Sequence, residues 1–161
     1  MDVDDRPGDE EAGNLLIVAC AAVEPEVLRN ELKSRTEKQK LRVHVVVPAS
    51  RISRLHWFTS DEDKPHRRAD VLMKAVIDNL ADVVEAEGHV GDTDPHRAVA
   101  DALVTFPATE ILFIVQPPKT EHFLEHELVD KTRSAHDIPT AQLVGISDER
   151  PPTGTFTQFR R

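Results

Sequence analysis

The segment from Glu87 to Pro118 constrains the fold more than any other, because its pattern predicts a strand, a turn, a helix and a second strand. Asp94 is a favourable N-cap residue, and Pro95 suits the first helical position, where a missing N–H costs nothing. The run Ile111–Val115 is apolar without alternation, which is typical of a strand covered on both faces. Such a unit predicts a parallel, right-handed crossover.

The rest of the chain continues this alternation of strands and helices. Apolar runs predict strands at 14–22, 41–47 and 138–146. Apolar residues at helical spacing predict helices at 24–38, 66–87 and 120–136. Gly88 is expected to end the second of these helices, which leaves a short strand ending at His89 and Val90. Five strands that alternate with four helices predict an α/β protein with helices on both faces of a layered sheet.

Two segments belong to the periphery of this sheet. Pro139 cannot donate a ladder hydrogen bond, so the last strand is expected either to lie at an edge or to begin with this residue. The connection 49–65 is long for a compact domain and contains Trp57 and Phe58. It is either a lid over a pocket or an insertion whose aromatic side chains dock on the core. The usual burial of aromatic residues favours the insertion.

Composition excludes several classes of partner. Twenty Lys and Arg residues against 29 Asp and Glu residues give a formal net charge of -9. This balance argues against a general nucleic-acid binder, which needs a basic face, and against an anionic membrane surface. No apolar run approaches the roughly 20 residues of a membrane span. We therefore expect neither a nucleic-acid partner nor a membrane partner.

The chain is long enough for one domain with a substantial core. Residues 1–13 are acidic and rich in helix breakers, so we expect a disordered tail and not a secretory signal. Residues 14–146 form the expected domain, and 147–161 a loose C-terminal tail. The single cysteine, Cys20, excludes an internal disulfide and is expected to be a small buried residue. A reducing, cytoplasmic compartment is the simplest expectation.

In open α/β sheets the ligand crevice lies at the carboxyl ends of the strands. Here these ends are the turns 21–24, 48–51, 91–94 and 116–120. Asp92, Asp94 and His96 meet at the third turn, either as a cation or ribose-hydroxyl site or as turn and cap residues, and the latter is favoured. Lys119 and Thr120 begin the last predicted helix, where a helix N-terminus with a lysine can hold an anion.

One further pattern is typical of a metal site. His122, Glu125 and His126 match the H-x-x-E-H pattern of inverted zinc proteases, and the two histidines share one helix face. Such a pair arises readily by chance in a chain with eight histidines, so a solvated helix face is favoured and no metal is expected. The sequence contains neither a Ser-His-Asp spacing nor a nucleophile elbow, and we expect no catalytic residue.

The order of strands and helices, the segment EGHVGDTDPHRAVADAL and the following PATEILFIVQ together resemble the universal stress protein family. Members of this family typically have V-x-x-G-D-P-x-x-A-I and then an A-D-L-I-V-M-G strand. The resemblance covers residues 14–146. It implies a three-layer Rossmann-like sandwich of the adenine nucleotide alpha hydrolase type, with a five-stranded parallel sheet in the order 3-2-1-4-5. It also implies a stress-response or regulatory role, often as a homodimer formed through the last strand.

Two positions depart from the ATP-binding members of that family. Those members have G-x2-G-x9-G-[ST] after the fourth strand, where glycines let backbone N–H groups surround phosphates. This chain has Gln116-Pro117-Pro118 there, and 116–133 contains no glycine. Family members also usually have an aspartate at the end of the first strand, where this chain has Ala21-Ala22. The phosphate chemistry of the family therefore does not transfer to these residues.

Two functional hypotheses follow. The first is a cytoplasmic binding or regulatory domain that is not an enzyme, needs no cofactor and acts as a homodimer or with another protein. The second is a binder of ATP or another adenine nucleotide with a non-standard phosphate site, in which adenine lies near Val47 and Asp92 contacts ribose. The candidate nucleotide-binding residues are Ala21, Val47, Gly91, Asp92, Gln116, Lys119 and Thr120.

Overall fold

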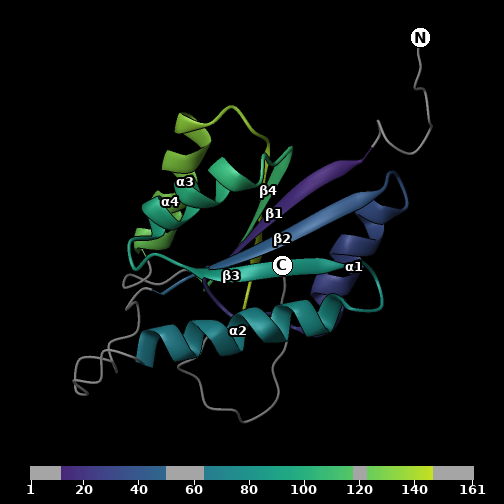
Figure 1. Ribbon diagram of the computed structural model, residues 1–161, viewed down its shortest axis with the longest axis horizontal. Coiled ribbons are helices and arrows are strands. Elements are labelled where there is room, and N and C mark those ends of the chain that lie inside the picture. The colour runs from purple at the N-terminus through teal and green to yellow at the C-terminus, as the bar shows by residue number, and fades with distance from the viewer. Residues whose placement is uncertain (1–11, 50–63, 118–122, 147–161) are drawn as a thin grey trace.

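A computed structural model describes residues 12–49, 64–117 and 123–146 (Figure 1). Five parallel strands form one sheet in the order β3-β2-β1-β4-β5, and a helix follows each of the first four strands. This arrangement confirms the α/β fold and the strand order implied by the resemblance. The strands are β1 (Gly13–Ala19), β2 (Leu41–Pro48), β3 (Ala86–Gly91), β4 (Glu110–Val115) and β5 (Thr140–Val144). The helices are α1 (Pro25–Thr36), α2 (Lys64–Leu80), α3 (Pro95–Thr105) and α4 (Phe123–Ala135).

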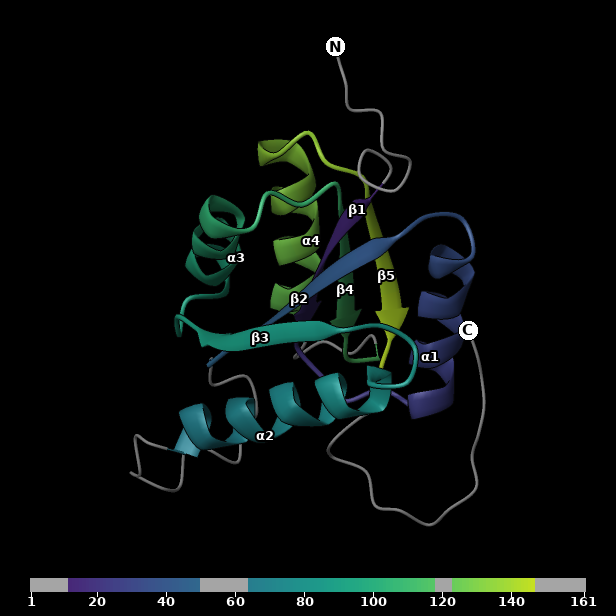
Figure 2. The same ribbon diagram turned by 45° about the vertical axis from the view of Figure 1, so that its right-hand side comes forward.

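The helices divide the core into two layers, one on each face of the sheet (Figures 1 and 2). Leu15 and Ile17 of β1 face the layer under α1 and α2, whereas Leu16 and Val18 face the layer under α3 and α4. Ile111–Val115 of β4 is buried throughout, as its unbroken apolar run predicts. None of the helices in the described ranges is long and apolar enough to cross a membrane.

Helix α3 begins where the sequence predicts. The Asp94 carboxylate accepts a hydrogen bond from the backbone N–H of His96 at 3.0 Å, and Pro95 occupies the first turn. The Asp94 carbonyl accepts the first intrahelical bond, from the Ala98 N–H at 2.9 Å. The Asp94 side chain thus satisfies the His96 N–H, a donor that has no partner within the helix.

The end of α2 differs from the prediction. The helix ends at Leu80 and not at residue 87, because the Leu80 carbonyl accepts N–H groups from both Val83 and Val84, at 2.8 and 2.9 Å, in a closing turn. The two valines keep helical spacing yet pack on the α1 and α2 layer from this turn. Gly88 therefore does not end a helix. It lies inside β3, where a Cβ atom would come within 2.6 Å of the Val45 carbonyl oxygen.

The remaining boundaries shift by a few residues. β1 starts at Gly13 and ends at Ala19, so Cys20 follows the strand, half-buried, and packs on the α3 and α4 layer. β5 is an edge strand that begins just after Pro139, as predicted. Lys64 already belongs to α2 and not to the preceding connection. Gly13, predicted as the last residue of the N-terminal tail, is instead the first residue of β1. The interpretations of Trp57 and Phe58, of residues 1–11 and of the C-terminal tail concern residues outside the described ranges.

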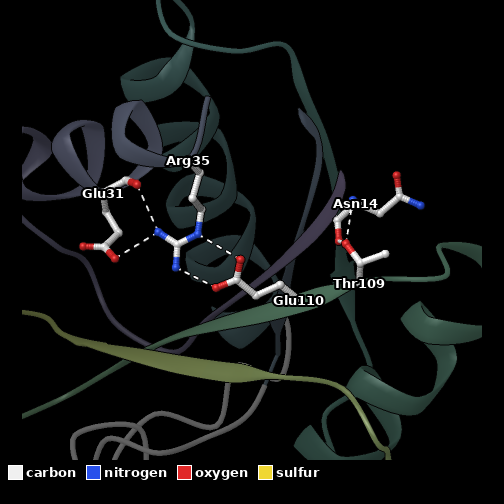
Figure 3. A network of polar contacts seen from close by, with 5 residues as sticks. All are labelled: Asn14, Glu31, Arg35, Thr109 and Glu110. Carbon is white, nitrogen blue, oxygen red and sulfur yellow. Dashed lines mark hydrogen bonds and ion pairs between the residues drawn. The ribbon is translucent and has the colours of Figure 1, made fainter. Parts of the chain in front are cut away.

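Two groups of polar contacts lie at the amino ends of β1 and β4 and join these strands to each other and to α1 (Figure 3). Arg35 of α1 donates from Nε and Nη2 to the two carboxylate oxygens of Glu110, at 3.0 and 2.7 Å, and from Nη1 to the Glu31 carboxylate at 2.9 Å. Hydrogen bonding to Glu110 raises the pKa of the Arg35 guanidinium, although burial opposes the effect. The pair attaches α1 to the first residue of β4.

The second group of contacts joins β1 to the segment before β4 (Figure 3). The Thr109 N–H donates to the Asn14 carbonyl at 2.8 Å, and the Asn14 N–H donates to Thr109 Oγ1 at 3.0 Å. The Asn14 side-chain amide also donates to the Pro107 carbonyl at 2.9 Å. These bonds fix the register in which Leu15 lies beside Glu110.

We predict that Glu110→Gln lowers the free energy of unfolding by about 1 to 2 kcal/mol, because Arg35 loses a charged, two-pronged partner in a half-buried position. Urea denaturation measures the loss. The matched control is Asp70→Asn, which removes an exposed ion pair with Lys74 and is expected to cost less than about 0.5 kcal/mol. Equal losses in the two variants would contradict the role assigned to Glu110.

Candidate functional site

The carboxyl edge of the sheet is the expected ligand position. At this edge, backbone hydrogen bonds join the end of β2 to the end of β3. The Ala49 N–H approaches the carbonyl oxygens of Gly91 and Asp92 at 3.3 and 3.2 Å. Val47, the candidate neighbour of an adenine ring, is only 2% exposed, and its side chain packs in the α1 and α2 layer. Val47 therefore supports this edge from the core and exposes almost no surface to a ligand.

Gly91 is buried at the end of β3, where the strand and α3 approach each other closely. A Cβ atom at this position would lie 2.7 Å from the Ala98 Cβ and 3.0 Å from Val46 Cγ2. The absence of a side chain thus permits the close contact between α3 and the sheet. In the described structure Gly91 acts as a packing residue.

The two aspartates that follow make the turn and cap contacts that the sequence favours. Asp92 Oδ1 accepts the backbone N–H of Asp94 at 2.8 Å, which closes a turn on its own side chain. It also lies 3.5 Å from Thr93 Oγ1. Asp94 in turn caps α3. Each carboxylate therefore has one oxygen engaged in holding the β3–α3 connection, and Asp92 is the more buried of the two.

The turn after β1 reaches across to the segment that follows β5. The Ala22 carbonyl accepts the Ile146 N–H at 2.8 Å, and the Gly145 N–H donates to the Val115 carbonyl at 2.7 Å. A Cβ atom at Gly145 would lie 2.2 Å from the Ala22 oxygen and 3.1 Å from the Ala21 Cβ. Ala21, a predicted site residue, is thereby buried in a contact between two backbone segments.

Sequence analysis did not single out Gly145. The available signal was its position near the end of the last predicted strand, 138–146, in a chain with only six glycines. A glycine at a strand end often marks a close approach of backbone, but the sequence does not say which segment approaches.

Gln116, 6% exposed, is the predicted site residue that follows β4. Lys119 and Thr120, the candidate anion-binding residues, lie outside the described ranges, as does His122. The side chains of Glu125 and His126 are likewise not described. Among the residues that the structure describes, no three His, Cys, Asp or Glu side chains lie close enough together to hold a metal ion. The described part of the edge thus contributes two carboxylates in local turn contacts and one buried amide.

Comparison with solved structures identifies proteins that share this fold, whereas the sequence comparisons do not find a relative. No protein family model matches the chain, and no curated protein sequence does. The structure of a universal stress protein from Archaeoglobus fulgidus superposes with a TM-score of 0.55 at 15% identity, over 80% of this chain and 91% of that chain. The described fold is therefore that of universal stress proteins, and at this identity the likeness concerns the fold alone.

We predict that Gly145→Ala destabilises the protein by about 1 to 3 kcal/mol, because the added methyl group meets a backbone carbonyl that cannot move without shifting the turn after β1. Thermal or urea unfolding measures the change. Gly13→Ala is the matched control, since its Cβ would meet only the flexible end of the Gln39 side chain, at 3.0 to 3.1 Å. If the two variants are equally stable, the contact between Gly145 and Ala22 is not the constraint described above.

Proposed function

We propose that this protein is a non-catalytic binding or regulatory domain with the universal stress protein fold, which works in the cytoplasm as a homodimer. The observation that carries the proposal is the shared fold, combined with a sequence that lacks the glycine-rich phosphate loop. After β4 the chain continues Gln116-Pro117-Pro118, and a proline has no N–H to offer a phosphate. A role in a stress response, through protein contacts, accords with this combination.

The edge of the sheet at β5 supports the proposed dimer. Among the strands in the described part of the chain, β5 pairs only with β4, so its other backbone edge is available as a template for a further strand. Val144 is 52% exposed on this strand, and Ile146 just beyond it is 44% exposed. A second copy of the chain, paired through the same strand around a two-fold axis, would cover the backbone edge and both side chains.

We predict a mass of twice 18.0 kDa in multi-angle light scattering. Val144→Lys is expected to shift the protein to monomer, because a charged lysine on an edge strand opposes pairing with a further strand and both copies would carry one. The matched control is Val104→Lys, on an exposed position of α3 that is 81% accessible, and it is expected to stay dimeric. A wild-type protein that remains monomeric at high concentration would refute the dimer.

The second candidate function is nucleotide binding at the same carboxyl edge. It is supported by the half-buried carboxylate of Asp92 at the end of β3 and by Lys119 and Thr120 in the sequence just before α4. In this proposal Asp92 contacts ribose and Lys119 contacts phosphate. Val47 and the turn at Ala21 then lie nearest to the adenine ring, with Gln116 and Gly91 beside them.

Isothermal titration with ATP, ADP, AMP and cyclic AMP separates the two functions. The leading proposal predicts no binding heat with about millimolar ligand. Any binding would then be weaker than a free energy of roughly -4 kcal/mol, which corresponds to a millimolar Kd. Nucleotide binding predicts a saturable heat signal, and Lys119→Ala is expected to lower the affinity. The control Lys131→Ala removes an exposed lysine of α4 and is expected to leave the affinity unchanged. Saturable binding with this pattern would replace the leading proposal by the second.

A further inference from the structure

Two histidines form a direct contact between β2 and β3. His44 Nε2 lies 2.8 Å from His89 Nδ1, and the ring centroids are 5.0 Å apart. His44 shares its face of the sheet with Val46, two residues along β2, so both rings lie on the side that α3 covers. Phe106, the C-cap residue of α3, packs against His44 with a centroid distance of 5.4 Å. The pair thus connects the β3 edge of the sheet to the C-terminal end of α3.

The hydrogen bond between the rings requires one hydrogen and one lone pair. Either His44 donates from Nε2 to a bare Nδ1 of His89, or His89 donates from Nδ1 to a bare Nε2 of His44. A neutral pair satisfies this condition, and so does a pair that has taken up one proton. When both rings are protonated, each of the facing nitrogens carries a hydrogen. Two positively charged donors then face each other, and the bond is lost.

The surroundings of His44 disfavour its charged form. Burial lowers the pKa of His44, the neighbouring His89 lowers it further, and Glu87 acts in the opposite direction. On β1 the residue beside His44 is Leu16, which carries no charge. The charged and titratable groups of the elements packed around the pair are Glu87 of β3, Arg42 on the same face of β2, and the exposed residues His96, Arg97 and Asp101 of α3.

We propose that the contact between His44 and His89 is a pH-sensitive latch, closed while one hydrogen lies between the two rings and open once both rings are protonated. Opening removes the side-chain hydrogen bond between β2 and β3 beside the packing of Phe106 and leaves only the backbone ladder between the strands, so β3 and the last turn of α3 loosen together. The latch lies on the face of the sheet that α3 covers, and it depends neither on a nucleotide nor on the proposed dimer.

The direction of the pH effect follows from proton linkage. Because the pKa of His44 is lower in the folded protein than in the unfolded chain, the unfolded chain binds more protons in this range. The contribution of His44 to the free energy of unfolding is therefore fully present above the ordinary histidine pKa of about 6.5. It decreases as the pH falls below that value.

The test compares four full-length proteins by urea denaturation between about pH 8 and pH 5, the range in which histidines titrate. These are the wild type, His44→Gln, His89→Gln and the control His136→Gln, at a half-buried residue of the connection from α4 to β5. Glutamine keeps a donor and an acceptor but cannot take up a proton. The folding equilibrium constant of the wild type and of the control is expected to fall together on acidification. That of His44→Gln and of His89→Gln is expected to fall less.

A second measurement keeps the test decisive if one variant does not fold. Nitrogen chemical shifts of the imidazoles in the wild type report the protonation state of each ring, and hydrogen exchange reports the opening of β3. Exchange of β3 amides, corrected for intrinsic rates, is expected to accelerate only as the second ring becomes protonated. An identical pH dependence in wild type and His44→Gln, or full protonation of both rings without faster exchange, would overturn the latch.

Discussion

The burial of β1 and β4 between two layers of helices is the constraint on which the rest of the structure depends. These neighbouring parallel strands pair with Leu16 beside Ile111 and are covered on both faces. A strand buried on both faces needs apolar side chains at every position, and its parallel partner must be reached by a crossover that carries a helix. The chain meets both conditions, since helices cover both faces and the two central strands contain no charged residue between Leu15 and Ala19 or between Ile111 and Val115.

The sequence predicts those parts of the fold that depend on local pattern. Asp94 and Pro95 define the start of α3 through cap chemistry, and the apolar run of β4 is visible without any partner. The end of α2 could not be predicted in the same way, because Val83 and Val84 keep helical spacing after the helix has ended. The role of Gly88 could not be predicted from the sequence for a related reason. Its lack of a side chain serves the approach to the Val45 carbonyl, a contact that exists only in the assembled sheet.

The candidate site shows the same division between local and tertiary information. The turn contacts of Asp92 follow from a side chain that bonds its own backbone, so sequence reasoning could favour them. The contact between Gly145 and Ala22 joins segments that are far apart in the chain, and it requires the turn after β1 to cross toward β5. The approach of His44 to His89 likewise depends on the register of β2 and β3. No spacing in the sequence encodes either contact.

Glycine has a different task at this carboxyl edge than it has in a phosphate-binding loop. In such a loop glycines allow several N–H groups to point at one anion. Here Gly91 and Gly145 let a helix and a backbone turn approach more closely than a Cβ atom would permit, and the N–H of Gly145 is bonded to Val115. Glycines used for packing leave fewer donors for a ligand. The described edge therefore favours contacts made by side chains and by strand pairing over enclosure of a phosphate by backbone.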